Sequence, residues 1–376
     1  MIGEALDRKD EDLHSKAGKL IETRCLRLDA VDSDAYDRYV QSHEGASPYH
    51  YSAWLKAVEA AYGHQAWIIL AEREGIVCGV LPFVYVKPPL GSGSLVSLPF
   101  CDIGGILADD ESVEASLRLA GGHLAQQLGL SEAQLRTTGS SMDDDPDSET
   151  VAQAPKVSMR CELPESSEAL FKSYKPKLRS QIRKAEKNGL SATVSCTPEA
   201  VKAFYPVFAA NMRRLGSPTH SLAWFLALQA AYGPDMVIGL VFSGETVVGG
   251  GVVLRRGDLA SIPWASTLAE YNRLAPNMLL YWTLLSYLSD NGCRVFDFGR
   301  SSLGEGTYRF KQQWGAKPYT LQWDKLTSAG DILPTTTTTP SRQARQIRAW
   351  IEWLWQRLPL ALANHLGPRI RKYITL

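Results

Sequence analysis

The chain has 376 residues, of which 45% are hydrophobic and 21% charged, as in an ordinary folded protein long enough for two compact domains. Its 40 Lys and Arg residues equal its 40 Asp and Glu residues, so the overall charge directs it to neither nucleic acid nor membrane. The six scattered cysteines form no Cys-x-x-Cys pair, which predicts no metal site, no disulfide framework and a cytoplasmic location.

A unit of hairpin, strand and helix is repeated along the chain. In the first half we expect strands at 66–70, 76–86 and 95–98 and a helix at 113–128. In the second half we expect strands at 236–242, 246–254 and 259–265 and a helix at 276–288. Because Gly79 and Gly249 occupy equivalent places in the two return strands, the pattern predicts a duplicated α/β fold. The alternative is chance similarity between two generic hairpins.

Composition predicts where these units begin and end. The stretch at 139–155 is acidic with two prolines, and the stretch at 334–340 holds five threonines between prolines, so both are expected to be linkers. The sequence contains no run of eighteen apolar residues, so we predict no membrane span. The expected parts are a disordered arm (1–22), a first subdomain (23–138), an acidic linker (139–155), a second subdomain (156–333), a tether (334–340) and a basic amphipathic helix (341–376).

A basic helix is expected between Pro176 and Gly189, since proline suits the first helical turn and glycine the end. Its cationic stripe consists of Arg179, Arg183 and Lys187. Two interpretations remain open for this stripe: a solvated surface, or a wall that faces an anionic substrate.

The most informative stretch is 296–315, which reads FDFGRSSLGEGTYRFKQQWG. A strand carries Asp297 into a glycine-containing loop, and Tyr308 and Lys311 follow it. A carboxylate, a lysine and a tyrosine in this order could supply the proton acceptor, oxyanion partner and clamp of an acyl-transfer site. The alternative interpretation is a strand, a turn and a solvated pair of cations. Further candidates in the loop, for substrate binding, are Arg300, Gly304 and Gly306.

The segments YKPKLRSQIRKAEKNG and FDFGRSSLGEGTYRFKQQWGAKP resemble the FemAB-like transferases, in particular the branch that accompanies exosortase (XrtA) and PEP-CTERM surface systems. The resemblance covers roughly residues 25–323. It implies two tandem subdomains of the GCN5-related N-acetyltransferase (GNAT) fold, a mixed-sheet α/β architecture, with a BioF2-like acetyltransferase domain as the second. FemAB proteins transfer an amino acid from aminoacyl-tRNA to an amine of a peptidoglycan precursor, whereas relatives of this fold use acyl-CoA.

The resemblance implies that Lys311 lies at the reacting carbonyl, with Asp297 at the strand end and Tyr308 as the aromatic residue before the Phe-Lys pair. Two departures leave the donor open between acyl-CoA and aminoacyl-tRNA, either one a co-substrate and not a bound cofactor. No coiled-coil arm occurs between residues 164 and 323. The place of the pyrophosphate loop, 271–277, has no glycine and ends at Pro276 and Asn277.

Two residues of the first half are weaker candidates for substrate binding. His50 lies in a helix-entry segment that borders the acceptor groove in this fold, although a lone histidine is more often structural. Asp102, in a glycine-flanked loop, could line the cleft between the subdomains.

The tail at 341–376 is basic, rich in tryptophan and amphipathic. It could lie on the inner face of the plasma membrane, or dock on the protein itself or a partner. We expect an N-acyltransferase that joins an acyl or aminoacyl donor, with tRNA as one candidate, to an amine of an envelope or exopolysaccharide precursor. That acceptor is a small-molecule or lipid-linked anion. The competing interpretation is a catalytically silent GNAT-like scaffold of an exopolysaccharide or protein-sorting system.

Overall fold

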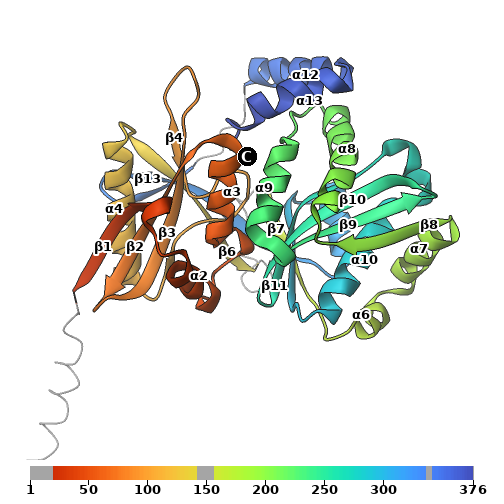
Figure 1. Ribbon diagram of the computed structural model, residues 1–376, viewed down its shortest axis with the longest axis horizontal. Coiled ribbons are helices and arrows are strands. Elements are labelled where there is room, and N and C mark those ends of the chain that lie inside the picture. The colour runs from red at the N-terminus through yellow and green to blue at the C-terminus, as the bar shows by residue number, and fades with distance from the viewer. Residues whose placement is uncertain (1–19, 142–155, 336–340, 376) are drawn as a thin grey trace, which may run out of the picture.

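A computed structural model describes residues 20–141, 156–335 and 341–375 of the chain (Figure 1). Most of the predicted arm, acidic linker and tether therefore lies outside the described residues. Strand β1 begins at Ile21, inside the range expected for the arm. No helix in the described ranges combines the length and the apolar character that crossing a membrane would require.

The described elements follow one another in two similar series. The first half comprises β1 (Ile21–Arg27), α2 (Ser33–Ser42), α3 (Ser52–Tyr62), β2 (Gln65–Arg73), β3 (Ile76–Val86), β4 (Ser94–Val96), β5 (Leu107–Ala108), α4 (Glu111–Gln127) and β6 (Glu132–Ser141). The second half comprises β7 (Lys156–Glu162), α6 (Ser167–Ser173), α7 (Pro176–Lys187), β8 (Leu190–Ser195), α8 (Pro198–Arg214), α9 (Leu222–Tyr232), β9 (Met236–Ser243), β10 (Thr246–Arg256), β11 (Leu259–Thr267), α10 (Pro276–Asp290), β12 (Val295–Ser302), α11 (Gly306–Gln312), β13 (Lys317–Thr327) and β14 (Ile332–Pro334).

The two halves repeat the same backbone irregularity. In the first hairpin Gly79 pairs with Ala71, and the register shifts there because Cys78 is an extra residue. In the second hairpin Gly249 pairs with Val241 and the register shifts at the equivalent position. A bulge conserved between two copies at the same place is a feature of the fold and not of chance pairing. The predicted duplicated α/β fold is confirmed.

A single mixed sheet joins the halves, with strand order β1-β2-β3-β4-β6-β13-β7-β12-β11-β10-β9-β8. Strand β13 comes from the end of the second half, yet it pairs antiparallel with β6 of the first half as well as with β7. The halves are therefore interlocked by backbone hydrogen bonds, and neither has a complete sheet without the other.

Aromatic packing holds the helices at the junction together. Helices α3 and α9 lie side by side between the halves (Figure 1). Trp54 of α3 contacts Trp224 of α9 edge to face, with ring centroids 5.2 Å apart, and stacks on Trp264 of β11 at 6.2 Å. Both Trp54 and Trp224 are fully buried, so this cluster fixes how the first half faces β11.

The tail forms two helices, α12 (Arg342–Arg357) and α13 (Leu360–Arg371), where the sequence pattern suggested one. The break falls at Leu358 and Pro359, because the residue before a proline is driven to an extended conformation. After α13 the chain turns back, and its end lies between the two halves (Figure 1).

A buried arginine holds this chain end and a strained loop together. Leu98 and Phe100 both adopt left-handed backbone conformations, with φ of 66° and 69°, which is unfavourable for side chains of this size. The guanidinium of Arg136 donates to the carbonyls of Leu98 (3.2 Å), Cys101 (2.8 Å) and Thr375 (2.9 Å). One fully buried side chain therefore connects the 98–101 loop to the C-terminus.

We predict that Arg136→Met lowers the free energy of unfolding by about 3 kcal/mol, because several buried carbonyls lose their donor. Arg24→Met is the matched control, since Arg24 is half exposed and makes a surface pair with Glu72, a type of pair that contributes less than about 1 kcal/mol. Denaturant unfolding measures both. Equal midpoints for the two variants would contradict the connecting role of Arg136.

Candidate active site

The candidate site forms where two parallel strands separate. Strands β11 and β12 are paired only from Leu259 and Val295 to Ser261 and Asp297. Beyond that point Gly299 adopts φ +71°, and the register of β12 against β7 also shifts. A left-handed residue in a strand bends it at little cost only when it is glycine. The bend at Gly299 therefore opens the space between the strands.

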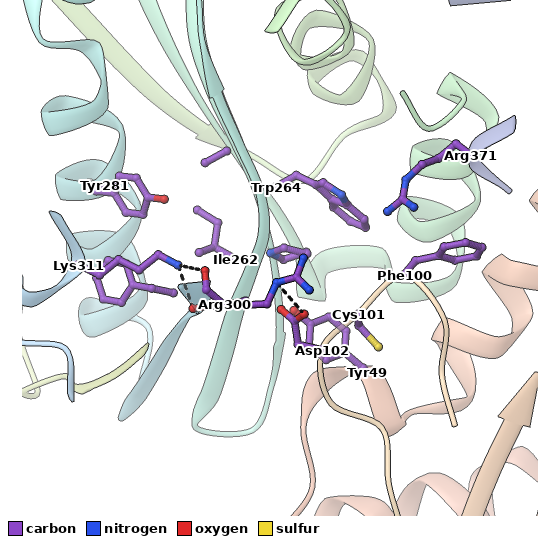
Figure 2. A pocket seen from close by; sticks show the side chains of 14 residues that line it. Tyr49, Phe100, Cys101, Asp102, Ile262, Trp264, Tyr281, Arg300, Lys311 and Arg371 are labelled. Carbon is purple, nitrogen blue, oxygen red and sulfur yellow. Dashed lines mark hydrogen bonds and ion pairs between the residues drawn. The ribbon is translucent and has the colours of Figure 1, made fainter. Parts of the chain in front are cut away.

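This space is a cavity of about 290 Å³ to which both halves contribute (Figure 2). The first half supplies the 100–102 loop and Tyr49, and the second half supplies β11, β12, α10 and α11. The lining residues are Tyr49, Phe100, Cys101, Asp102, Ile262, Pro263, Trp264, Ala265, Tyr281, Phe298, Gly299, Arg300, Lys311 and Arg371.

Lys311 lies in the wall of this cavity. Its Nζ donates to the carbonyl oxygens of Gly299 at 2.9 Å and Arg300 at 2.8 Å. An ammonium has three N–H groups, so these two bonds leave one for a ligand in the cavity. The side chain is 8% exposed, and burial lowers the pKa of Lys311 to about 8, against the opposing effect of Asp297 and Asp102.

Asp297 is adjacent to the cavity but does not line it. Its Oδ1 accepts from the hydroxyl of Ser158 at 2.6 Å and from the backbone N–H of Gly299 at 2.7 Å, and its Oδ2 lies 3.5 Å from Arg160. The carboxylate thus holds the left-handed turn at Gly299 in place. This geometry matches the role of a positioning residue for the bend.

Three further charged groups surround the cavity. Arg300 of β12 lies 3.6 Å from Asp102 of the opposite half, between Nε and Oδ1. Burial raises the pKa of Asp102 and outweighs the nearby Arg300. Arg371 enters from the tail, so the cavity contains three cations, counting Lys311, and one carboxylate.

The other candidates of the 296–315 stretch lie outside the cavity lining. Tyr308 is half-buried on α11, where its hydroxyl accepts from the side-chain amide of Gln312 at 3.1 Å. Gly304 and Gly306 are exposed in the loop before α11. Their proposed contacts with substrate stay predictions.

His50 is buried, and hydrogen bonds to the loop backbone occupy both of its ring nitrogens. Its Nδ1 accepts from the backbone N–H of Ser47 at 3.0 Å, and its Nε2 donates to the carbonyl of Gly105 at 3.3 Å. Burial lowers the pKa of His50 to about 4. His50 is not among the residues that line the cavity. Its hydrogen bonds instead support the loop that carries Asp102.

The basic stripe lies on α7, on the outer part of the second half (Figure 1). Arg183 is exposed, with its guanidinium 5.2 Å from the ring centre of Phe171. At the other end of the stripe, Lys187 is followed by Asn188, whose side chain donates to the carbonyl of Leu274 at 3.2 Å. The C-terminal end of α7, with Lys187, thus adjoins the loop that precedes α10, whereas Arg179 lies near the start of α7.

The loop before α10 has the turn that a glycine would usually supply. Ala275 adopts the left-handed conformation with φ +64°, and α10 begins directly after it at Pro276. Asn277 is exposed in the first turn of this helix. The loop sequence lacks glycine, yet its backbone makes the sharp turn into a helix N-terminus, the kind of end that favours anionic groups.

Sequence reasoning missed several cavity residues, namely Tyr49, Phe100, Trp264, Tyr281 and Arg371. Trp264 lies in the strand that was predicted to end at residue 265, so its place next to the separating strands could have been inferred. For Arg371 the sequence indicated only a basic tail, because no local pattern indicates that the tail returns to the cleft. Among the described residues, no group of three or more His, Cys, Asp or Glu side chains is placed to hold a metal ion.

Comparisons with known proteins agree with this architecture. A protein-family profile described as "Acetyltransferase (GNAT) domain" matches residues 172–312. The crystal structure of FemX superposes with a TM-score of 0.64 at 15% identity, covering 82% of this chain and 98% of that chain. A tandem GNAT protein from the clavulanic acid biosynthesis pathway gives a TM-score of 0.50 at 11% identity, covering 82% and 99%. No curated protein gave a significant match.

At these identities the structural matches establish a shared fold, and the predicted mixed-sheet α/β fold is confirmed. Residues 172–312 match the profile of a GNAT acetyltransferase domain, within a chain that has the fold of FemX and of the tandem GNAT protein.

Proposed function

We propose that the protein is an N-acyltransferase of the FemAB type, which forms an amide between an activated acyl or aminoacyl donor and an amine acceptor. The observation that carries this proposal is Lys311, a buried ammonium with one N–H available to a ligand at the point where β11 and β12 separate. In such a water-poor site a fixed donor stabilises developing negative charge far more than it would in water.

The reaction needs no nucleophile from the protein. The neutral amine of the acceptor forms a bond from its nitrogen to the acyl carbon, and the carbonyl electrons move to oxygen, where the ammonium of Lys311 stabilises the oxyanion. Collapse of this intermediate breaks the bond between the acyl carbon and the sulfur or oxygen of the donor. The proton lost by nitrogen passes to that leaving group, with Asp102 as the carboxylate suited to carry it.

Two residues are proposed to position these groups. Arg300 lies beside Asp102 and orients its carboxylate toward the cavity. Asp297 acts one step removed, because it holds the Gly299 turn whose carbonyl accepts from Lys311. The mechanism accordingly requires the carboxylate of Asp297 for geometry and not as the base.

The donor is proposed to be aminoacyl-tRNA or acyl-CoA, both of which bear phosphates. The left-handed Ala275 and the start of α10 support such a donor, since helix N-termini favour phosphate groups. The adjoining end of α7, with Lys187, adds positive charge there. For the acceptor, the resemblance to FemAB proteins favours an amine on an envelope or exopolysaccharide precursor. Membership of the exosortase-associated branch stays a prediction from sequence.

We further propose that the tail contacts an anionic membrane surface, where a lipid-linked acceptor would be found. Four large apolar residues of α12 form an exposed stripe at i, i+3, i+4 and i+7, namely Ile347 (54% exposed), Trp350 (61%), Ile351 (50%) and Leu354 (43%). Over 341–376 the charges are seven basic residues and the single acid Glu352, although the whole chain is neutral. An exposed apolar stripe with tryptophan and a positive surround fits anionic lipid.

We predict that Lys311→Met slows amide formation by about 10²- to 10³-fold in single-turnover assays, as expected for loss of one oxyanion donor. The donor for this assay is first identified by a thermal-shift screen of acetyl-CoA, longer acyl-CoAs and charged tRNA. Arg309→Met on the exposed side of the same helix is the control and should keep the wild-type rate. A folded Lys311→Met protein at full rate, or a screen with no stabilising donor, would favour the scaffold interpretation.

The rate should also fall, relative to that of a variant whose cation does not titrate, as pH rises through about 8. Because the pKa of Lys311 is about 8, the fraction of its charged form, which stabilises the oxyanion, decreases above that pH. Lys311→Arg keeps its charge, so any residual activity of this variant should persist to higher pH. Because the neutral fraction of the acceptor amine changes equally for both proteins, a ratio of wild-type to Lys311→Arg rate that stays constant between pH 7 and pH 10 would exclude the ammonium as the oxyanion partner.

Membrane contact is tested by flotation with vesicles of phosphatidylcholine alone or mixed with phosphatidylglycerol. The wild type should bind only the mixed vesicles, and Trp350→Ser with Ile351→Ser should weaken binding about tenfold or more through lost apolar burial. Leu90→Ser, which changes an 89% exposed residue of the first half, is the control. Unchanged flotation of the double variant would contradict the role of α12, and point variants are preferable to truncation because the tail continues into the cavity.

A further inference from the structure

We propose that the hydroxyl of Tyr281 is the second hydrogen-bond donor to the oxyanion, beside the ammonium of Lys311. This role rests on the proposed function, because an oxyanion forms only if acyl transfer takes place. Two of the three N–H groups of Lys311 are bonded to the carbonyls of Gly299 and Arg300, so the lysine can give the oxyanion only one hydrogen bond. A negative oxygen in a buried site is poorly compensated by a single donor.

Aromatic neighbours fix the ring of Tyr281. It stacks on Phe298 of β12, with centroids 5.5 Å apart and 23° between the planes, and contacts Phe310 of α11 edge to face at 5.1 Å. Phe298 directly precedes Gly299 in the chain, and Phe310 directly precedes Lys311. The cluster that holds the tyrosine ring therefore also holds the two ends of the lysine–carbonyl hydrogen bond.

The hydroxyl of Tyr281 faces the cavity without a hydrogen-bond partner in the part of the chain that the structure describes. The side chain is buried and lines the cavity, and no hydrogen bond contributes to its pKa. Tyr174, in the same aromatic cluster, has a hydroxyl that is sealed from solvent, whereas the hydroxyl of Tyr281 can be reached from the cavity. Because burying a hydroxyl without a partner is costly, we expect a ligand in the cavity to supply the partner.

The hydroxyl and the ammonium point into the same part of the cavity. Figure 2 shows Tyr281 and Lys311 at one end of it, with the hydroxyl oxygen and Nζ both directed inward. A donor carbonyl oxygen that accepts from the remaining N–H of Lys311 would lie in the space that the hydroxyl also faces. Two fixed donors from α10 and α11 would then approach this oxygen from two directions, as in an oxyanion hole.

The two donors should respond differently to pH. Burial raises the pKa of Tyr281 above its ordinary value of about 10, and no charged group contributes to that shift. The hydroxyl therefore keeps its proton between pH 7 and pH 10. For Lys311, burial lowers the pKa, Asp297 and Asp102 favour the charged form, and Arg300 opposes it. Only the ammonium is expected to titrate in this range.

Single-turnover transfer to hydroxylamine, a small amine that is neutral throughout this pH range, tests the role with the donor that the thermal-shift screen identifies. Tyr281→Phe keeps the ring and should slow transfer about 10- to 100-fold, less than Lys311→Met because a neutral donor stabilises an anion less than a charged one. The Kd of the donor should stay close to the wild-type value, since the oxyanion exists only during reaction.

Tyr174→Phe is the matched control. Tyr174 and Tyr281 both contact Trp314, at 5.5 and 6.1 Å between ring centroids, but Tyr174 does not line the cavity. Its variant should keep the wild-type rate. The ratio of the wild-type rate to that of Tyr281→Phe should stay constant between pH 7 and pH 10, whereas the ratio of the wild-type rate to that of Lys311→Met should fall.

The outcomes separate this role from the proposed function. A folded Tyr281→Phe protein at the wild-type rate, beside a slow Lys311→Met protein, would overturn the second donor and leave the acyltransferase standing. Equal losses in Tyr281→Phe and Tyr174→Phe would also overturn it, as a general effect of the aromatic cluster. So would a loss explained entirely by donor affinity, or a Tyr281→Phe ratio that varies with pH. No transfer by the wild type from any donor of the screen would remove the proposed function and this role together.

Discussion

The site depends on one bend, the left-handed turn at Gly299 that takes β12 away from β11. The bend creates the cavity, and it also turns the carbonyls of Gly299 and Arg300 toward the ammonium of Lys311. Burying an ammonium is costly unless it is hydrogen-bonded. The two carbonyls therefore provide the hydrogen-bond acceptors that the buried lysine needs. Asp297 completes the arrangement because it accepts from the N–H of Gly299 and fixes the turn.

The second requirement is that the two halves keep a fixed relation, since the cavity has walls from both. Strand β13 pairs with β6 and β7, and the Trp54–Trp224 contact fixes α3 against α9. The tail adds a third connection through Arg136, which also stabilises the strained loop that carries Asp102. The duplicated fold thus has one proposed catalytic cavity and not one in each half. The strands that separate in the second half form this cavity, while the first half and the tail supply its opposite wall.

Much of the fold could be predicted from sequence, because its signals are local. The alternation of apolar residues gave the hairpins, and Pro176 and Gly189 bracketed α7, which ends at Lys187. The strand and the glycine loop before Lys311 were also predictable, whereas the short helix α11 that carries Lys311 was not predicted. What could not be predicted depends on contacts distant in sequence, such as the return of Arg371 to the cleft. The loop before α10 shows another limit, since Ala275 adopts the left-handed turn that sequence reasoning assigns to glycine.

The most direct measurement of the central claim is a crystal structure with a stable donor analogue, such as an acyl-CoA or aminoacyl-nucleotide with a nonreactive linkage. The account predicts that the acyl carbonyl oxygen lies about 3 Å from Nζ of Lys311, with the lysine still bonded to the carbonyls of Gly299 and Arg300. An analogue bound in another cavity, or an acyl group that lies beside β11 and β12 with its oxygen directed away from Lys311, would contradict it.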